Sequence, residues 1–578
     1  MAKIKPEKAS EKITITRFGG IRRTSALTGA SASEMRNFRI SSDGSLEKRT
    51  GTKTLYDFGM TIRGVWHGAL HGVDYLIIVA GANVYIKLDG QSEPTLRQQL
   101  PGSPTGNVSF MPFGGTLYLF DGNNIYRFTT LSASASNSFV PALGYAPLYG
   151  DCWSPSNMGP VNEPFNALCT RIRIRYDNSV NATTFRLPFG ALSLDRVEVD
   201  GVAITPNSYV PGSTSFSIPQ QHAHGILSVA LTLPSTYNHR SSIAGLAGSL
   251  LVADANRSIV LLYGGTSQQQ IAYSAPVSNE MMKECNRVFS TVEEPLYFPL
   301  ENIFSLTDSA HPIHAVFRDR NRIIALNDRF AWALEFSGDK LISYPLEGGV
   351  GCSSPGGWTL CGNHPVTIQN SGIFELRFPS GESDICLSES LSQEIIELLP
   401  PSVLQNGILA WFPGRSELWM RDPTEADEGL VWVYKRDQKE WYCFSNLYIT
   451  GFFELDGTIG FGTMNGALLV PDETSYSDSG EPVTANYYSQ YLAFSSPEDF
   501  KRAIRTTVCA DTGGQQLIII TQTDSRSRPC SVVNRQTDVP LYFEYSMNMG
   551  RFRFLRFVFN VTGDSAARIY RLSMLANP

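Results

Sequence analysis

Short apolar segments joined by polar turns recur along most of this sequence. Residues 75–88 read YLIIVAGANVYIKL and residues 117–128 read LYLFDGNNIYRF, so each holds an apolar strand, a Gly or Asn turn and a second strand with a tyrosine. Tyr85 and Tyr126 lie 41 residues apart, the repeat length of a four-stranded propeller blade. The pattern returns in residues 249–263, 321–336, 407–420, 430–444 and 457–470. These hairpins, without amphipathic helices between them, predict a β-propeller.

Two stretches depart from the repeat. Residues 150–240 contain strand-like segments at 170–176 and 194–219, with a turn at Asp200-Gly201 and a further extended segment around Tyr209. This stretch predicts a small β-domain inserted between blades. After Pro482 the chain changes to strands with two-residue alternation, plainest in Arg551-Phe552-Arg553-Phe554, which predicts a C-terminal β-sandwich.

The predicted fold class is therefore all-β: a β-propeller interrupted by an inserted small β "platform" domain and followed by a C-terminal β-sandwich. The number of blades stays open, because blades with diverged sequences escape this pattern. The expected domains are an N-terminal hairpin with the first blades (1–149), the platform domain (150–240), the remaining blades (241–480) and the sandwich (481–578).

The segment NFRISSDGSLEKRTGT, residues 37–52, predicts one β-hairpin. Asp43-Gly44 would supply the two positive-φ residues of a type I′ turn. Gly19 and Gly20 precede it in the segment RFGG. It contains no nucleophile, metal cluster or phosphate loop, so we interpret it as a structural signature.

Composition sets the class of protein. The chain of 578 residues is long enough for two to four domains, and its 17% charged residues are few for a helix-rich soluble protein. It has no apolar window long enough for a transmembrane helix and no apolar core of a secretory signal near its start. The nine cysteines show no short CxxC spacing, which predicts free core thiols made in a reducing cytoplasm.

Charge is distributed unevenly along the chain. Residues 1–50 and residues 501–578 each hold 11 Lys or Arg against 5 Asp or Glu. With a net charge of −7 overall, the part between them is strongly acidic, which argues against ordinary gripping of DNA phosphates. We interpret the basic ends as β surfaces rich in arginine, with nucleic-acid contact as the less favoured alternative.

Histidines and acids give only weak candidate sites. His222 and His224 would share a strand face as a metal pair, but no third ligand is near in sequence, so a polar loop is favoured. His311 and His314 lie in a segment that is not helical. His67 and His71 flank a blade turn, where ring donation to backbone carbonyls is expected.

The acidic loop RDPTEADEGL contains Asp422, Glu425, Asp427 and Glu428. We expect it to be solvated, with cation binding left open. No nucleotide-binding, zinc-protease or serine-hydrolase motif is present, and the sialidase Asp-box repeat is absent. A glycosidase carboxylate pair stays open, because such a pair needs only proximity in space. The sequence thus predicts no enzyme, no cofactor and no metal.

The start of the chain resembles that of tailed-bacteriophage tail proteins, most closely the nozzle family (tail tubular protein B, or packaged-DNA stabilisation protein). The matching residues are Gly19, Gly20, Asn37, Asp43, Gly44, Leu46, Lys48, Arg49, Gly51 and Thr52. The family usually has Pro where Thr50 stands. The sharp motif covers about 35 residues, whereas the order of propeller and inserted platform is similar over most of the chain.

The resemblance implies a structural virion protein, made in the host bacterial cytoplasm and then built into the tail. Six copies would form a homohexameric ring below the portal and its adaptor, continue the DNA channel, help retain packaged DNA and let it exit at infection. Partners would be the adaptor ring, double-stranded DNA that passes without sequence-specific binding, and tail fibres or spikes on the outer surface. The acidic middle would line the channel so that DNA slides. The C-terminal sandwich is not common to all members.

Two alternatives remain. The first is a hub or distal tail protein of a long-tailed phage, since related openings occur there. The second is a carbohydrate-binding or carbohydrate-cleaving β-propeller, which a pocket with exposed Trp residues and paired carboxylates would favour.

Overall fold

The protein was analysed as a computed structural model, which describes most of the chain. The described residues are 10–23, 30–102, 106–128, 139–253, 258–266, 269–289, 295–306, 311–320, 322–379, 384–455, 457–494, 498–524, 526–532, 541–546 and 549–577. They form two compact units. Unit 1 comprises Met1–Ile62, Cys352–Arg377 and Leu387–Pro578, and unit 2 comprises Arg63–Gly351 and Phe378–Cys386.

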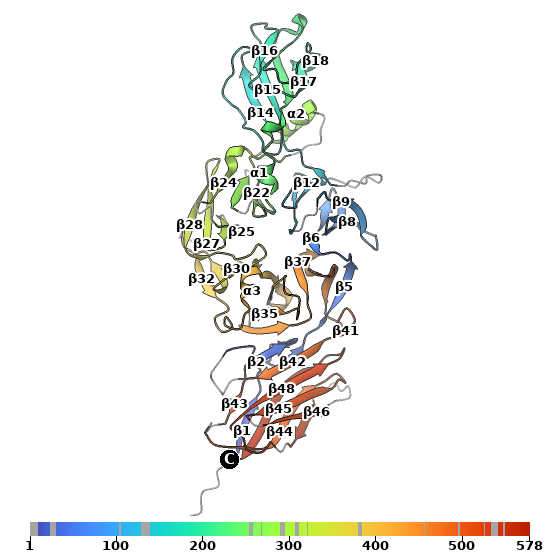
Figure 1. The fold of residues 1–578 in the computed structure, drawn as a ribbon, viewed down its shortest axis with the longest axis vertical. Helices are drawn as coiled ribbons and strands as arrows, with labels where there is room; N and C mark the ends of the chain where they lie inside the picture. Colours follow the sequence, from blue (N-terminus) through green and yellow to red (C-terminus); the bar gives the residue numbers. More distant parts are fainter. Residues whose placement is uncertain are drawn as a thin grey trace, which may run out of the picture. The chain divides into compact units, whose positions relative to one another are not determined.

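The chain is all-β and contains the blades of a β-propeller (Figure 1). Four antiparallel blade sheets belong to unit 2. They are β6(Ile62–Leu70)–β7(Val73–Ala80)–β8(Asn83–Leu88)–β9(Thr95–Gln99), β10(Ser109–Phe113)–β11(Thr116–Phe120)–β12(Ile125–Phe128)–β13(Val140–Pro141), β21(Gly248–Ala253)–β22(Ser258–Tyr263)–β23(Gln270–Tyr273)–β24(Ile303–Ser305) and β25(Ile313–Asp319)–β26(Arg322–Asn327)–β27(Phe330–Ser337)–β28(Lys340–Val350). Strands such as β11 are buried along their whole length, because both faces of a blade pack on apolar side chains.

Three further blade sheets belong to unit 1. They are β29(Trp358–Cys361)–β30(His364–Gln369)–β31(Gly372–Arg377)–β32(Leu387–Ser390), β33(Ile408–Phe412)–β34(Glu417–Arg421)–β35(Val431–Lys435)–β36(Glu440–Phe444) and β37(Ile449–Leu455)–β38(Thr458–Thr463)–β39(Ala467–Asp472)–β5(Gly51–Asp57). In the last sheet the outer strand comes from the N-terminal part of the chain, where Tyr56 pairs with Leu468. This closure holds residues 51–57 in the blade that the chain builds some 400 residues later.

An inserted β-domain lies between β13 and β21. Its main sheet has the order β14(Leu148–Trp153)–β15(Arg171–Asp177)–β20(Ile226–Thr232)–β17(Ser193–Val199)–β18(Val202–Ile204), and β16(Thr184–Arg186) pairs with β19(Ser215–Ser217). Asp200 and Gly201 both have positive φ, 50° and 80°, as a type I′ turn between β17 and β18 requires. The segment around Tyr209 does not form a strand, and the Tyr209 hydroxyl donates to the carbonyl oxygens of Ala191 (3.0 Å) and Ser213 (2.8 Å).

The C-terminal strands form a β-sandwich together with strands from the N-terminal part (Figure 1). One sheet contains β3(Phe38–Ile40), β4(Leu46–Lys48), β49(Arg568–Asn577), β44(Arg502–Asp511) and β47(Leu541–Tyr545), with β1(Glu11–Ile15) also paired to β49. The other contains β2(Ala32–Arg36), β42(Thr484–Ser489), β48(Phe554–Thr562), β45(Leu517–Thr523) and β46(Ser527–Val532), with β43(Leu492–Ala493) on β48. Its edge strand β2 also pairs with β36, where Arg36 lies opposite Cys443, so this sheet continues into the blade sheet β33–β36. The N-terminal hairpin, which was grouped with the first blades on sequence, thus lies in the sandwich sheet, since Leu46 pairs with Ile569.

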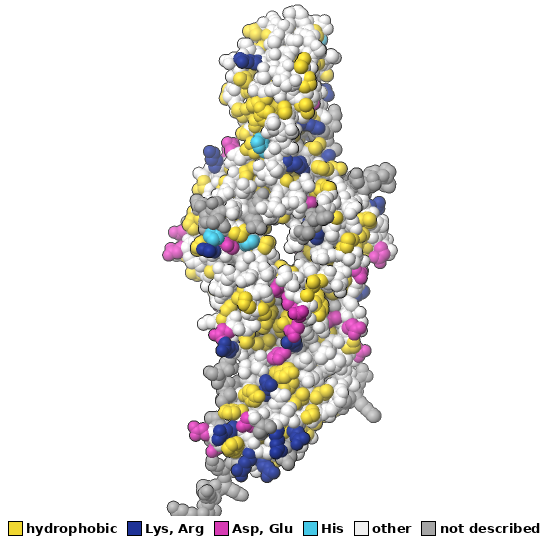
Figure 2. Space-filling view, in the orientation of Figure 1, with side chains coloured by type: hydrophobic (Ala, Val, Ile, Leu, Met, Phe, Trp, Pro, Cys, Tyr) yellow, Lys and Arg dark blue, Asp and Glu magenta, His cyan; other side chains and the backbone are white. Residues whose placement is uncertain are grey.

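Helices are few in the described part of the chain. The longest is α2(Asn279–Phe289), inserted between β23 and β24, and two short ones are α1(Ser241–Ala244) and α3(Pro401–Asn406). The nine cysteines are all free, and seven of them are buried. Figure 2 shows Lys and Arg side chains gathered over the sandwich strands of unit 1, where the exposed arginines are Arg502, Arg505, Arg526, Arg528, Arg551, Arg553 and Arg571.

Candidate functional site

Asn37 lies at the centre of a buried polar joint in unit 1. It has a positive φ of 58° between β2 and β3, and its side chain is 1% exposed. Its Oδ1 accepts hydrogen bonds from Arg49 Nε (2.8 Å) and from the backbone N–H of Ser445 (2.9 Å). Its Nδ2 donates to Ser445 Oγ (2.8 Å) and to the carbonyl of Thr484 (2.7 Å). One amide therefore connects the hairpin, the end of a blade strand and the first long strand of the sandwich.

Arg49 completes this joint through a carboxylate. Its Nη1 and Nη2 lie 2.9 and 2.5 Å from Oδ1 and Oδ2 of Asp478, a bidentate geometry. Nη2 also donates to the carbonyl of Ser445 at 3.2 Å, and the Thr52 hydroxyl donates to Asp478 Oδ1 at 3.2 Å. We call Asn37, Arg49, Gly51, Thr52 and Asp478 the signature joint.

The glycines of the motif make room for close backbone approach. A Cβ on Gly51 would lie 1.8 Å from the carbonyl oxygen of Ser477, and a Cβ on Gly20 would lie 2.3 Å from that of Trp441. The Gly20 N–H donates to Glu440 Oε2 at 2.9 Å, and the Gly19 N–H donates to the carbonyl of Ala30 at 2.9 Å. Gly51 belongs to the signature joint, whereas Gly19 and Gly20 fix the N-terminal segment beside β36.

Asp43 and Gly44 lie at the hairpin turn, apart from the signature joint. Gly44 has a φ of 85°, but Asp43 does not have the positive φ of a type I′ turn. The Gly44 N–H donates to Ser41 O and the Ser41 N–H to Ser45 O, the pattern of a type I turn followed by a bulge glycine. The expected turn type was therefore wrong, because the loop between the hydrogen-bonded residues Ser41 and Ser45 has three residues rather than two. Asp43 instead pairs with Arg568 at 2.9 Å.

A second buried ion pair, which sequence reasoning missed, lies beside the signature joint. Arg39 Nε donates to Glu417 Oε1 (2.8 Å), and the same carboxylate accepts from Trp419 Nε1 and the Tyr442 hydroxyl, each at 2.9 Å. Burial alone would raise the pKa of Glu417, but the charge of Arg39 and these donors lower it. The Arg39 and Arg49 guanidinium carbons lie 4.8 and 5.5 Å from the centre of the Phe444 ring.

Lys48, another motif residue, is buried against neutral acceptors. Its Nζ donates to Gln515 Oε1 (3.1 Å), to the carbonyl of Gly563 and to that of Ser565 (3.4 Å). Burial lowers its pKa to about 8. The lysine thus ties β4 to the loops of the sandwich, and among the described residues no carboxylate lies within ion-pair distance of it.

The histidine candidates do not assemble into a site. His222 ends a short 3₁₀ helix (Gln220–His222), and His224 Nδ1 lies 3.5 Å from Asp200 Oδ2. His311 Nδ1 lies 2.7 Å from Asp328 Oδ1, and burial lowers the pKa of His314. His67 pairs with the Asp74 carboxylate at 3.1 Å, not with the backbone carbonyl expected. Over the described residues, no group of three or more His, Cys, Asp or Glu could hold a metal ion.

The acidic loop after β34 is held by its own contacts. Glu425 accepts from Arg421 Nη1 and from the backbone N–H groups of Asp427 (2.7 Å), Glu428 (2.6 Å) and Leu430 (3.1 Å). Burial opposes ionisation, but these donors outweigh it and lower the pKa of Glu425 to about 2. Its carboxylate oxygens are thus used to fold the loop.

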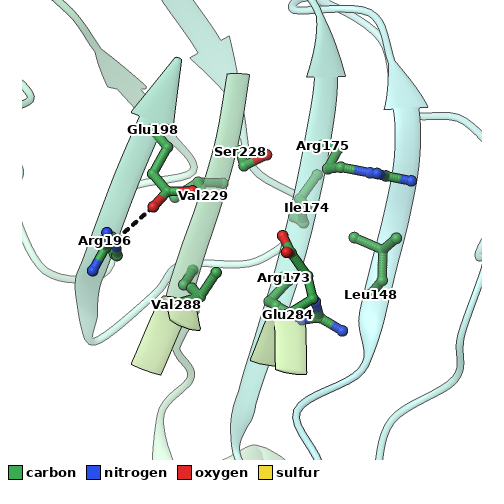
Figure 3. Close-up of a pocket in the computed structure, with 11 residues that line it drawn as sticks. Leu148, Arg173, Ile174, Arg175, Arg196, Glu198, Ser228, Val229, Glu284 and Val288 are labelled. Carbon is green, nitrogen blue, oxygen red and sulfur yellow. Dashed lines mark hydrogen bonds and ion pairs between the residues drawn. The ribbon is translucent and has the colours of Figure 1, made fainter. Parts of the chain in front are cut away.

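Helix α2 covers one face of the inserted sheet and closes a small pocket (Figure 3). Figure 3 shows Glu284 and Val288 of α2 over β15 and β17. Glu198 of β17 is 1% exposed, and its Oε1 accepts from Arg196 Nε and from Arg287 Nη1 of α2, both at 2.6 Å. The cavity of about 30 Å³ has room for about one water molecule. This arrangement is suited to holding the helix on the sheet.

Comparisons with known proteins find only remote structural similarities. No family model and no curated protein matches the chain. A solved structure named "Glycoside hydrolase" is 11% identical, with 90% of this chain and 99% of that one covered and a TM-score of 0.22. The β-propeller domain of Myceliophteria thermophila Cps50 (Swd1) is 9% identical, with 74% and 100% covered and a TM-score of 0.32. The AfRom2 CNH domain is 11% identical, with 73% and 99% covered and a TM-score of 0.23.

Similarity this low supports no statement about activity or partners. One further structural finding concerns membranes: across the described ranges, no helix is long and apolar enough to cross one.

Proposed function

We propose that this chain is a structural virion protein of a bacteriophage tail, a subunit of a nozzle ring that continues the DNA channel below the portal and its adaptor. The ring would be a homohexamer that helps retain packaged DNA and releases it at infection. The observation that carries the proposal is the signature joint. Asn37, Arg49 and Thr52, which carry the resemblance to the nozzle family, form internal hydrogen bonds that connect the hairpin, the last blade and the sandwich.

A motif whose side chains bind one another supports a structural role better than a catalytic one. Asn37, Arg49 and Asp478 satisfy one another inside unit 1, so they offer no group to a substrate. The glycines of the motif likewise serve close packing. We therefore propose a non-catalytic role in the virion, with synthesis in the host cytoplasm.

Charge supports a division of surfaces within this proposal. The exposed arginines over the sandwich would face protein neighbours such as the adaptor ring or fibres (Figure 2). The acidic part between residues 51 and 500 would line the channel and keep DNA phosphates from adhering. Ejection rates of virions with lumen acids changed to Gln should then fall most at low salt, and rates equal to wild type at every salt concentration would exclude this lining.

Electron microscopy of the purified chain, alone and mixed with its adaptor ring, tests the nozzle proposal. Six-fold rings with a hole wide enough for a DNA duplex are expected in at least the mixed sample. Rings that appear only with the adaptor would mean that assembly is templated from it. Single particles in both samples would overturn the proposal.

A further inference from the structure

The first strands of the three blade sheets in unit 1 line an open, aromatic pocket. Strands β29, β33 and β37 each form the terminal strand of a sheet, and the pocket between them has a volume of about 460 Å³. This is within the range of small-molecule sites, about 300–1,000 Å³. Four aromatic side chains, all partly exposed, contribute to its walls: Trp358, Trp411, Phe452 and Phe453.

Packing on the core and on nearby glycines fixes three of these rings. Trp411 and Phe452 pack on the core of unit 1 with part of each ring exposed, so that the core fixes them. A Cβ on Gly451 would lie 2.8 Å from the Phe453 ring and one on Gly462 would lie 3.2 Å from it, so the ring lies close over both glycines. Leu360 of β29 is 44% exposed at the same pocket. Aromatic area is thus presented to solvent by rigid strands.

The polar groups of the pocket are hydroxyls and one carboxylate. Thr359, Thr458 and the exposed Glu454 belong to its lining, and no Lys, Arg or His does. An anionic ligand such as a phosphate would find no positive partner there. A ligand with hydrogen-bond donors and an apolar face would find both an acceptor and ring surfaces.

We propose that this pocket binds a neutral sugar ring, as part of a glycan. The C–H face of a pyranose would stack on Trp358 or Trp411, and its hydroxyl groups would donate to Glu454 and exchange hydrogen bonds with Thr359 and Thr458. All residues that line the site lie in unit 1 of one chain.

Titration of the full chain tests the proposal by ligand-observed NMR and by tryptophan fluorescence. The probes are a panel of neutral hexoses, N-acetylhexosamines and their disaccharides, with tetramethylammonium and inorganic phosphate as comparison ligands. We expect millimolar or tighter binding of at least one sugar, weakened about tenfold or more in Trp358→Ala and Trp411→Ala.

Substitutions at two exposed residues test sugar binding without removing a side chain from the core. Leu360→Arg would block the pocket and Glu454→Gln would weaken the hydrogen bonds, and both should reduce sugar binding. Tyr542→Ala, at a 67% exposed aromatic on the sandwich, is the matched control and should leave binding unchanged. Binding of no sugar in the panel, sugar binding unaffected by Leu360→Arg, or selective binding of tetramethylammonium would each overturn the proposal. None of these results depends on whether hexameric rings form.

Discussion

Arg49 and Asp478 face each other as a bidentate ion pair, with the arginine 2% and the aspartate 17% exposed. The guanidinium Nε donates a hydrogen bond to Asn37 Oδ1 at the same time. Because an arginine has donors in a fixed fork, one side chain can satisfy both partners. The hairpin residues Asn37 and Arg49 are thereby fixed to a residue 429 positions after Arg49.

Replacing Arg49 should therefore be costly. We expect Arg49→Met to lower the free energy of unfolding by about 3 kcal/mol, because it removes the cationic partner of the half-buried Asp478 carboxylate and one of the two donors to Asn37 Oδ1. Arg49→Lys should recover only part of this loss, since an ammonium cannot form the fork. Arg505→Met, which removes an exposed pair with Glu544, should cost about 1 kcal/mol or less. Equal urea midpoints for the Arg49 and Arg505 variants would contradict a structural role for the joint.

Gly51 allows a second test. Gly51→Ala should destabilise the protein strongly, because its Cβ would overlap the Ser477 carbonyl oxygen, and the backbone of residues 475–479 would have to move. Gly414 has nothing within 4 Å of a Cβ position, so Gly414→Ala is a matched control and should be close to neutral. Thermal unfolding measures both, and a Gly51→Ala protein as stable as Gly414→Ala would exclude the close approach.

Lys48 should make the free energy of unfolding depend on pH in the alkaline range. Burial lowers its pKa from 10.5 to about 8, so the unfolded chain binds more protons than the folded one between these values. The stability of wild type relative to Lys48→Met should hence be constant below pH 8 and rise as the pH increases from 8 towards 10.5. Urea denaturation at pH 6 to 10 measures this difference. Lys53→Met, at an exposed lysine on β5, is the control, and a relative stability that falls above pH 8 would contradict the prediction.

The hairpins of the blades could be predicted from sequence because they are local. All seven segments identified by apolar alternation are antiparallel hairpins in the structure. Residues 407–420 and 430–444, however, belong to one sheet, and the sheet β29–β32 was missed. Its strand β30 reads HPVTIQ, where His and Pro break the apolar run. Which hairpins belong to one blade depends on pairing between distant strands, and the alternation of apolar and polar residues does not reveal that pairing.

The signature joint shows the same limit. Asn37, Arg49, Gly51 and Thr52 could be singled out from sequence, but their partner Asp478 could not. It belongs to the two-residue strand β40(Ser477–Asp478), within a segment of Ser, Asp and Gly that shows no alternation. Glu417 was equally hidden, because it is the first residue of a blade strand and its charged partner, Arg39, lies 378 positions away in the sequence. Ion pairs between residues far apart in the sequence produce no periodic pattern of apolar and polar positions.

Helix α2 should detach from the inserted sheet when its ion pair is removed. Arg287→Gln takes one donor from Glu198, whose carboxylate is buried, so amide hydrogen exchange in α2 should be faster by about tenfold or more. Lys283→Gln changes an exposed charge on the same helix and should leave exchange unaltered. Faster exchange in both variants would mean that helix propensity, and not the pair with Glu198, holds α2.

The two ends of the described chain lie in one sheet, because β1 pairs with β49. A change in β49 should therefore also affect the N-terminal strand, which the domain boundaries expected from sequence would not predict. Strand β49 lies between β44 and the N-terminal strands, with Leu572 opposite both Ile15 and Val508. Lys501 adds an ion pair to Glu11 at 2.5 Å. Leu572 is 1% exposed, so Leu572→Ala should cost about 2–5 kcal/mol.

That loss should reach the N-terminal strand. Hydrogen exchange in Leu572→Ala should be faster in Glu11–Ile15 as well as in Arg568–Asn577, while a blade strand such as β30 keeps its protection, because β30 does not pair with either sheet of the sandwich. Arg571→Ala, at the exposed neighbour, should change neither region. If Glu11–Ile15 exchanged at the wild-type rate in Leu572→Ala, the N-terminal strand would be held by contacts other than β49, and the sandwich would not depend on both ends of the chain.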